Sequence, residues 1–312
     1  MANHDYSHRP VLLDEVLKAL KVLPDGIYVD ATFGRGGHAG ALLNQLGSDG
    51  RLVAIDKDPQ AVRRAMELFG ADPRFVMRQG SFALLKTLIE SQGLLGKVNG
   101  ILLDLGVSSP QFDDPQRGFS FRHDGPLDMR MNPDGGISAA MWLKTAKEEE
   151  IVKVLRAYGE ERYARRIARA ITEARSTAPI ETTGRLAAIV AKANPAWEKG
   201  KDPATRSFQA LRIFINRELD DLQDCLRQVL DVLAVGGRLV VISFHSLEDR
   251  IVKRFIRQQA RGDDLPAAVP VTAAEVRPRL RRIGKAITPG AEEISLNPRA
   301  RSAIMRVAEK IS

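Results

Sequence analysis

The sequence predicts an α/β protein built on a doubly wound, Rossmann-like sheet that carries an inserted helical domain. Three observations lead to this fold class. Short apolar runs alternate with helical periodicity, several of these runs end in an acidic residue, and a long surplus of chain separates the fourth run from the fifth. Continuous apolar strands that alternate with helices are typical of a parallel sheet covered on both faces.

The elements follow in order along the chain. Apolar side chains from Leu13 to Leu20 recur at helical spacing, and this helix ends before Pro24. Apolar runs predict the first four strands at residues 27–30, 52–56, 75–77 and 101–104, with helices between them. Two further strands are expected, at residues 238–244 and 303–307.

The surplus of chain predicts an insertion rather than a second tandem domain. A crossover between parallel strands needs only about a dozen residues, usually one helix. The amphipathic helix expected from Leu219 to Leu233 would therefore suffice to connect the fourth strand to the fifth. We expect residues 113–212 to form an inserted helical, substrate-recognition domain, and residues 1–112 and 213–312 to form the sheet domain.

Composition excludes several classes of protein. Of the 312 residues, 44% are hydrophobic and 28% charged, as expected for a globular rather than a disordered chain. The single cysteine, Cys225, excludes an internal disulfide framework and fits a reducing compartment. No apolar run approaches the roughly 18–20 residues that cross a bilayer, and residues 1–10 lack an apolar signal segment. We therefore expect a soluble, cytoplasmic protein without a membrane partner.

The positive charge gathers in two places. The formal net charge of +8 is modest for this length, and it favours a polyanionic partner without naming one. One basic helix face is predicted from the arginines Arg162, Arg165, Arg166, Arg169 and Arg175. Residues 277–310 carry nine basic side chains against three acidic ones. Each element is either a solvated face, the usual outcome for a charge run, or part of a grip on a phosphate backbone.

A glycine-rich loop over residues 30–40 lies where the first strand turns into a helix. Glycines let a backbone pass close to a ligand, and the helix N-terminus adds free N–H donors. The spacing Gly34-x-Gly36-x-x-Ala39 also satisfies a dinucleotide-binding pattern, with Asp56 as the ribose ligand. A tight turn without any ligand remains an alternative at this point.

The placement of three acids separates the possible cofactors. Asp30, Asp56 and Asp104 end adjacent strands, so their carboxylates should line the crevice in which α/β sheets bind ligands. This suits S-adenosylmethionine, with its amino group, sulfonium and ribose, better than a pyrophosphate, which favours few negative neighbours. Solvated caps would account for one such acid but not for all three. Phe82, after the third strand, is a candidate to lie against adenine, or else a core residue.

An acceptor would meet the methyl group beside the loop after the fourth strand. Methyl transfer depends mainly on holding the nucleophile and the methyl group in line, and it requires no metal. Hydrogen bonds from an exocyclic amine could be accepted by Asp104, Ser108, Ser109 and the carbonyls of this loop, although Ser-Ser-Pro is also an ordinary turn sequence. His245, after the fifth strand, could orient the acceptor or take its proton, or simply be satisfied at the strand end. Ser246-x-x-Asp249 predicts a capping box for the next helix.

These residues and motifs closely resemble those of the MraW (RsmH) family of bacterial small-subunit rRNA cytidine methyltransferases. Nearly the whole chain takes part in the resemblance, which makes it far more specific than a glycine pattern. The matching blocks are residues 7–15, 32–38, 56–59, 100–111, 117–121, 124–131, 159–161, 204–206, 208–210, 242–253 and 297–302.

The resemblance implies an S-adenosylmethionine-dependent enzyme that methylates the exocyclic amine, N(4), of a cytidine in the decoding region of 16S rRNA. By position, the implied cofactor contacts are Gly36, Gly37, His38, Asp56, Phe82, Asp104 and Gln111. The resemblance does not imply that Asp30 contacts the cofactor; that expectation depends only on its position at a strand end beside the other two acids. In place of the Asn/Asp-Pro-Pro-aromatic motif of many amino-methyltransferases, the chain has Leu105-Gly106. The resemblance does not say how the target amine is held, and Ser109 and His245 remain our catalytic candidates.

The resemblance further implies 16S rRNA, within the small ribosomal subunit, as the partner. Because this RNA is structured, its target base would have to swing out to reach the pocket. The sequence leaves open whether the protein forms a homodimer. Two other classes of function stay open on the residues alone: a nicotinamide dehydrogenase, which the three acids disfavour, and an RNA-binding protein that transfers no methyl group.

Overall fold

The computed structural model of the protein describes residues 10–196, 202–262 and 277–312. Residues 7–9, with which the first block of the family resemblance begins, lie outside the described residues. The chain divides into two compact units. The core unit comprises Met1–Gly106 and Leu219–Ser312, and the inserted unit comprises Val107–Glu218.

The unit boundaries follow the ends of secondary-structure elements. The first division lies two residues after β4 (Val98–Asp104), and the second lies two residues after α10 (Thr205–Asn216). These divisions therefore fall at 106/107 and 218/219, where the sequence analysis had placed them at 112/113 and 212/213. The short helix α5 (Ser109–Asp113) thereby belongs to the inserted unit.

One seven-stranded sheet forms the centre of the core unit, in the order β3-β2-β1-β4-β5-β7-β6. The first five of these positions are parallel, which confirms the predicted doubly wound α/β fold. The parallel strands are β1 (Ile27–Asp30), β2 (Arg51–Asp56), β3 (Phe75–Gln79), β4 and β5 (Leu233–Ser243). From β1 the chain winds outward through β2 and β3 and then returns to β4 on the other side of β1. Ligands of such sheets bind at this switch point, outside the carboxyl ends of the strands.

Two antiparallel strands complete the sheet. β7 (Ile304–Lys310) pairs with β5 and lies near the strand expected at residues 303–307. β6 (Leu280–Ile287) pairs with β7 and forms the edge of the sheet. The sequence of the β6 segment indicates only a basic tail. Its side chains are exposed at five of the last six positions, and an edge strand of this kind lacks the apolar run by which buried strands are recognised.

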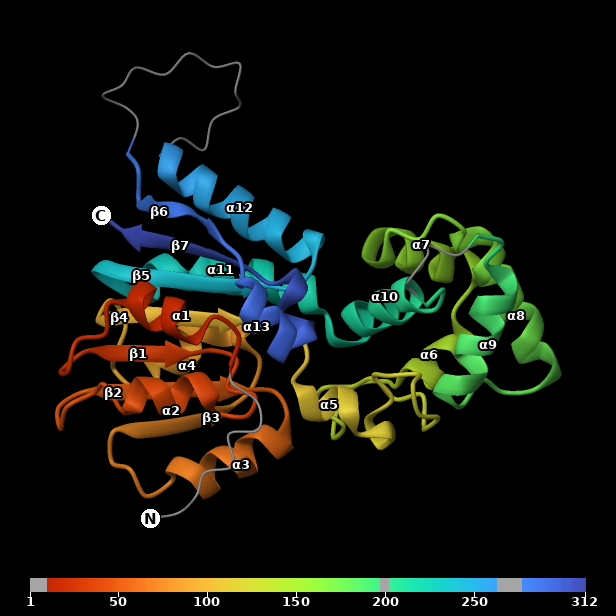
Figure 1. Cartoon of the computed structure of the whole chain (residues 1–312), viewed down its shortest axis with the longest axis horizontal. Helices are drawn as coiled ribbons and strands as arrows, with labels where there is room; N and C mark the ends of the chain where they lie inside the picture. The colour runs from red at the N-terminus through yellow and green to blue at the C-terminus, as the bar shows by residue number, and fades with distance from the viewer. Residues whose placement is uncertain (1–9, 197–201, 263–276) are drawn as a thin grey trace. The chain divides into compact units, whose positions relative to one another are not determined.

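Helices cover both faces of the sheet (Figure 1). One face packs against α1 (Leu13–Leu20), α2 (Gly37–Leu43) and α3 (Pro59–Phe69). The other packs against α4 (Leu85–Glu90), α11 (Glu218–Val232) and α12 (Ser246–Arg261). Cys225 is buried in the second of these layers, among Leu222, Leu226 and Val229. Burial on both faces explains why the central strands read as continuous apolar runs.

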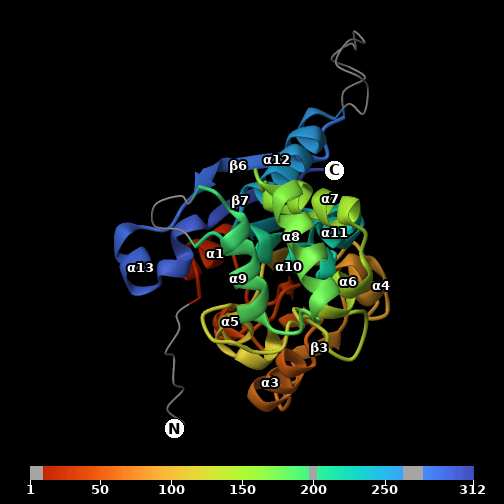
Figure 2. The ribbon, with the colours of Figure 1, turned by 90° about the vertical axis from the view of Figure 1, so that its right-hand side faces the viewer.

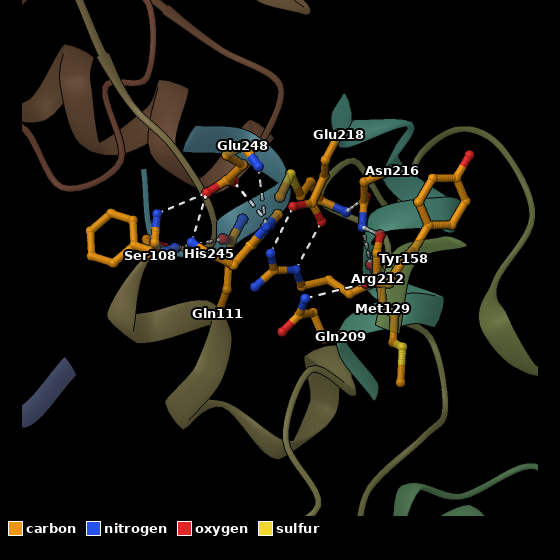
Figure 3. Close-up of polar contacts among 12 residues, drawn as sticks. Ser108, Gln111, Met129, Tyr158, Gln209, Arg212, Asn216, Glu218, His245 and Glu248 are labelled. Carbon is orange, nitrogen blue, oxygen red and sulfur yellow. Dashed lines mark hydrogen bonds and ion pairs between the residues drawn. The ribbon is translucent and has the colours of Figure 1, made fainter. Parts of the chain in front are cut away.

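The inserted unit is helical and has its own hydrophobic core. After α5 its helices are α6 (Ala139–Thr145), α7 (Glu148–Gly159), α8 (Ala164–Thr177), α9 (Thr183–Ala193) and α10. Figure 2 shows α8 and α9 lying side by side. Asn216, at the end of α10, fixes the preceding loop: its Oδ1 accepts from Met131 N at 2.7 Å and its Nδ2 donates to Met129 O at 2.7 Å (Figure 3). Both bonds hold Met129 at its positive φ of 65°.

Candidate cofactor site and acceptor side

Three acids meet at the carboxyl edge of the core sheet. Asp30 ends β1, Asp56 ends β2 and Asp104 ends β4, and these strands are neighbours in the order β2-β1-β4. Because the strands are parallel, the three carboxyl groups lie at one edge, on both sides of the switch point. The arrangement is the one expected for a ligand that carries positive charge and hydroxyl donors.

Asp30 is the most deeply buried of the three, with 1% of its surface exposed. Its Oδ1 accepts a hydrogen bond from Thr32 N at 3.2 Å, whereas its Oδ2 is buried without a partner among the described residues. Burial raises the pKa of Asp30 to about 7, and the nearby Asp56 adds to the shift. A buried acceptor left without a donor costs about 1–3 kcal/mol, so a ligand that donates to this oxygen would be favoured.

Asp104 has a similar environment. Its Oδ1 is buried and has no hydrogen-bond partner in the part of the chain that the structure describes. Burial raises its pKa to about 8, with further contributions from Asp30 and Glu248. The side chain of Thr32 links Asp104 to the glycine loop, because Thr32 Oγ1 accepts from Asp104 N at 2.6 Å. Thr32 therefore contacts both aspartates, the carboxyl group of Asp30 through its backbone N–H and the backbone N–H of Asp104 through its hydroxyl.

His38, at the start of α2, is buried and faces Asp104. Its Nε2 lies 3.1 Å from Val11 O, and since a carbonyl only accepts, this nitrogen carries the proton. Burial lowers the pKa of His38 to about 4, so the ring is neutral and its Nδ1 is an acceptor. Nδ1 lies 3.6 Å from Asp104 Oδ2, too long for a hydrogen bond. His38 therefore supports the Asp104 carboxyl group as a neutral neighbour and not as a counter-ion.

Asp56 anchors the glycine loop to β2. Its Oδ2 accepts from Gly34 N at 2.8 Å and its Oδ1 accepts from Asp58 N at 2.9 Å. Burial raises the pKa of Asp56 to about 6, against these backbone hydrogen bonds, which lower it. Each carboxylate oxygen has a second lone pair, so the carboxylate can hold the loop and still accept from a ribose hydroxyl.

The glycines of the loop are required by packing as well as by any ligand. Gly36 has a φ of 80°, and a Cβ there would lie 2.6 Å from Phe33 Cζ. A Cβ on Gly37 would lie 2.3 Å from Pro10 Cγ. The tight-turn interpretation and the ligand interpretation of this loop therefore do not exclude each other.

A group of polar residues that the sequence analysis did not single out supports Phe82. Asp221 of α11 accepts from Ser81 Oγ at 2.6 Å and forms an ion pair with Lys57. Ser81 in turn caps the short helix that begins at Phe82, and Lys57 Nζ lies 5.9 Å from the centre of the Phe82 ring. Phe82 itself is half-buried against the core, so it serves as a core residue and still presents part of its ring. In the sequence, the only sign of this polar group is that Lys57 directly follows Asp56.

Two of the predicted residues, Ser109 and Gln111, belong to the inserted unit. Ser109 is the first residue of α5. Gln111 is buried, and its Oε1 accepts from Ser108 N at 2.9 Å, closing a capping box at the start of this helix (Figure 3). The structure brings Gly36, Gly37, His38, Asp56, Phe82 and Asp104 together in the core unit.

His245 caps α12, and the predicted capping box is shifted by one residue. The backbone of His245 is extended, its ring accepts from Glu248 N, and Glu248 Oε2 accepts from Phe244 N at 2.8 Å (Figure 3). Ser246 and Asp249 do not form the predicted box, because His245 has the extended backbone of an N-cap and Ser246 is already the first residue of the helix. Asp249 instead receives two hydrogen bonds from Arg306, at 2.6 and 2.9 Å.

The basic face predicted in the inserted unit is only partly available to a polyanion. In the inserted unit Arg162 precedes α8, Arg169 pairs with Glu173 of the same helix at 2.8 Å, and Arg175 donates to Leu143 O. Arg165 and Arg166 are exposed on α8. The basic face predicted there is therefore smaller than five arginines.

The sequence as a whole is similar to those of known proteins. A family model, the MraW methylase family, matches residues 5–311. This chain belongs to the MraW methylase family. A curated member, the ribosomal RNA small subunit methyltransferase H of Thioalkalivibrio sulfidiphilus, is 56% identical over 307 residues, which cover 98% of each chain. The family resemblance found in the sequence is thereby confirmed.

Solved structures are similar at a lower level. An rRNA methylase from Streptococcus thermophilus is 12% identical, with a TM-score of 0.41 and 94% and 92% of the two chains covered. A SAM-dependent methyltransferase from Aquifex aeolicus is 9% identical, with a TM-score of 0.40 and 99% and 95% covered. At these values the similarities carry no argument about function.

Membership of the MraW methylase family makes the chain a methyltransferase that uses S-adenosylmethionine, as predicted, and decides against the nicotinamide alternative. The residues at the carboxyl edge fit this cofactor. At this edge, two buried carboxylate oxygens lack donors among the described residues, and the cofactor brings an amino group and ribose hydroxyls that can donate. Among the described residues, no helix is long and apolar enough to cross a membrane.

Proposed function

We propose that the chain methylates the exocyclic amine N(4) of a cytidine in the decoding region of 16S rRNA, within the small ribosomal subunit, in the cytoplasm. Its 56% identical relative carries the name of a small-subunit rRNA methyltransferase. The single observation that carries the proposal for the site is a pair of buried oxygens, Asp30 Oδ2 and Asp104 Oδ1, which lie at neighbouring strand ends and have no partner among the described residues. The finer points, N(4) and the decoding region, rest on the family resemblance.

The proposed cofactor contacts are Gly36, Gly37, His38, Asp56, Phe82, Asp104 and Gln111, with Asp30 added on the acid argument. When bound, S-adenosylmethionine supplies an electrophilic methyl group on a positively charged sulfur. Asp56 is suited to a ribose hydroxyl, because both of its oxygens are already oriented by backbone donors. Half-buried Phe82 offers its ring to adenine and is held by the Asp221 group.

The raised pKa values of Asp30 and Asp104 couple cofactor binding to ionisation. Near neutral pH, without a ligand, burial holds a large share of both groups protonated. A cationic amino group nearby favours the ionised form, so binding would release protons. In the complex, attraction to the cation offsets the free-energy cost of burying an ionised carboxylate. Without a ligand, nothing offsets that cost.

Catalysis on the acceptor side is mainly a matter of position. The amine lone pair is delocalised into the cytosine ring, and hydrogen-bond acceptors on its two hydrogens help to localise that pair on nitrogen. We keep Ser109, with Ser108, as candidate acceptors for these hydrogens. His245 is better suited to positioning than to taking a proton, because its Nδ1 caps α12 and its Nε2 therefore carries hydrogen when the ring is neutral.

The inserted unit is the proposed substrate-recognition domain. Its exposed arginines, Arg162, Arg165 and Arg166, are suited to phosphates and carry no sequence information by themselves. The target cytidine would be extruded from the RNA to reach the carboxyl edge of the sheet. A binding protein without methyl transfer would keep these arginines and would have no use for the buried acids.

A direct test incubates the purified chain with small ribosomal subunits that lack the modification, and with methyl-labelled donor. Nucleosides from the digested rRNA are then identified by mass spectrometry. The proposal predicts label in N(4)-methylcytidine and a large loss of label with the Asp104→Asn variant. Absence of labelled methylcytidine with free rRNA, partly assembled subunits and complete subunits alike would overturn it.

A further inference from the structure

A second feature of the core unit is a groove with a basic rim, lined by α12, β6 and β7. Figure 1 shows α12 lying along these two strands. The groove has a volume of about 250 Å³. Its lining residues are Lys253, Ile256, Arg257, Ala260, Arg261, Arg282, Ile283, Gly284, Lys285, Ala286, Arg306 and Val307. We call it the α12–β6 groove.

Charge is the distinguishing property of the α12–β6 groove. Six of its twelve lining residues are lysine or arginine, and none is acidic. Lys253, Arg257 and Arg261 follow one another at intervals of four on α12, so they share one helix face. Arg282 and Lys285 face them from β6. These five side chains are all exposed.

Several arginines in this part of the molecule have acidic partners, whereas among the described residues the five exposed cations of the groove's rim have none. Arg306 pairs with Asp249, and Arg238 and Arg281 both pair with Glu309. Within residues 10–196, 202–262 and 277–312, no carboxylate forms an ion pair with Lys253, Arg257, Arg261, Arg282 or Lys285. In the part of the chain that the structure describes, these three arginines are thus neutralised by carboxylates and the five rim cations are not.

A solvated face or a protected sheet edge would not produce this combination. Basic side chains on β6 would serve to discourage pairing of an edge strand. That function does not require three more cations on α12, which packs against β6 but, as a helix, has no unpaired strand edge to protect. Five like charges around one hollow repel one another, and a polyanion relieves that repulsion.

The apolar floor of the groove indicates which class of ligand it can bind. Ile256 and Val307 are each 3% exposed, and Ala260, Ile283 and Ala286 complete an apolar surface. A cationic rim above an apolar floor suits a ribose–phosphate chain, with phosphates at the rim. The lining has no asparagine, glutamine, acid or aromatic ring, the side chains that read or stack bases. Such a groove would bind the backbone without regard to sequence.

We infer that the α12–β6 groove binds the phosphate backbone of the RNA substrate as an anchor outside the methyl-transfer site. The inference rests on the proposed function for the identity of the RNA. Lys253 lies seven residues beyond the first residue of α12, or about 10 Å along a helix that begins at the carboxyl edge of the sheet. The anchor therefore holds a part of the RNA other than the target cytidine.

The test uses the full chain and the double variant Arg257→Glu/Arg282→Glu, which reverses one charge on each wall. The matched control is Lys18→Glu/Arg51→Glu, with the same change in charge at exposed positions outside the groove. Binding of labelled single-stranded RNA and of unmodified small subunits is measured between 50 and 300 mM salt, alongside KM and kcat.

We expect the groove variant to bind both RNAs about 10- to 30-fold more weakly at 0.15 M salt. Each of the two lost phosphate contacts contributes roughly 0.7–0.9 to the slope of log affinity against log salt concentration. KM should rise in the same proportion, the salt slope should fall by between about 1 and 2, and kcat and cofactor affinity should stay unchanged. The control variant should behave as the wild type.

The outcomes separate the inference from the proposed function. If the groove variant and the control had the same RNA affinity and the same salt slope, the inference that the groove binds RNA would be overturned. The proposed methyl transfer would not be affected. Weaker RNA binding by the groove variant, combined with a wild type that labels no cytidine, would support the groove and overturn the proposed function. Unchanged cofactor affinity in the variant shows that the core unit remains folded.

Discussion

Replacing Asp30 by asparagine should change the free energy of unfolding of the unliganded protein in a pH-dependent way, with a more favourable effect at high pH than at low pH. Asp30 is 1% exposed, and burial raises its pKa from 3.8 to about 7. The folded state therefore binds its proton more tightly than the unfolded state does, so this group makes the protein less stable as pH rises from about 4 to about 7. Asparagine has the same shape and does not ionise.

The magnitude follows from the pKa shift, at 1.36 kcal/mol per unit. The ionisation of Asp30 costs about 1–2 kcal/mol at pH 5 and about 4 kcal/mol at pH 8. The unpartnered amide of asparagine costs about 1–3 kcal/mol at either pH, so it cancels from the difference between the two. The effect of Asp30→Asn on the free energy of unfolding should accordingly be about 2–3 kcal/mol more favourable at pH 8 than at pH 5.

The assay is urea unfolding at the two pH values, followed by far-UV circular dichroism, without cofactor. Asp25→Asn, in the exposed turn before β1, is the matched control and should change the free energy of unfolding by less than about 0.5 kcal/mol at both pH values. If Asp30→Asn gave the same change at pH 5 and pH 8, or a larger stabilisation at pH 5, the account of a buried, strained carboxyl group would be wrong.

Three further predictions concern single contacts. Asp56→Ala should weaken S-adenosylmethionine binding by about 1–3 kcal/mol through lost hydrogen bonds, and unchanged affinity in isothermal titration would show that Asp56 does not hold the ribose. Gly36→Ala should destabilise the core unit by about 1–3 kcal/mol, because of its φ of 80° and the contact with Phe33 at 2.6 Å; a wild-type melting temperature would contradict this. Asn216→Ala should expose the backbone amides around Met129 to faster hydrogen exchange and cost about 1–3 kcal/mol, whereas unchanged exchange would refute its structural role.

The central sheet and its acids could be predicted because strands that are buried on both faces are continuous apolar runs in the sequence. β1, β2 and β4 are continuous apolar runs that each end in aspartate, and their pairing brings the acids to one edge. The carboxyl edge could thus be located from the order of the residues alone. Which oxygens lack partners could not, since that depends on where Thr32 and His38 place their donors and acceptors.

Other features escaped prediction for physical reasons. β6 is an exposed edge strand that pairs on one side only, so its sequence is basic and not apolar. Ser246 is a better cap by residue type than His245, yet the extended end of β5 decides the position of the cap. The basic groove joins α12 to β6 through a tertiary contact, and no spacing in the sequence reports such a contact.

The central claim is methyl transfer to one cytidine at a site organised by the three strand-end acids. The most direct measurement maps the label in 16S rRNA after reaction with small subunits, by mass spectrometry of nuclease fragments. The account predicts one labelled N(4)-methylcytidine, in a decoding-region fragment, with wild type and Asp25→Asn, and little or no label with Asp104→Asn. Label on another atom or in another region, or full labelling by Asp104→Asn, would contradict it.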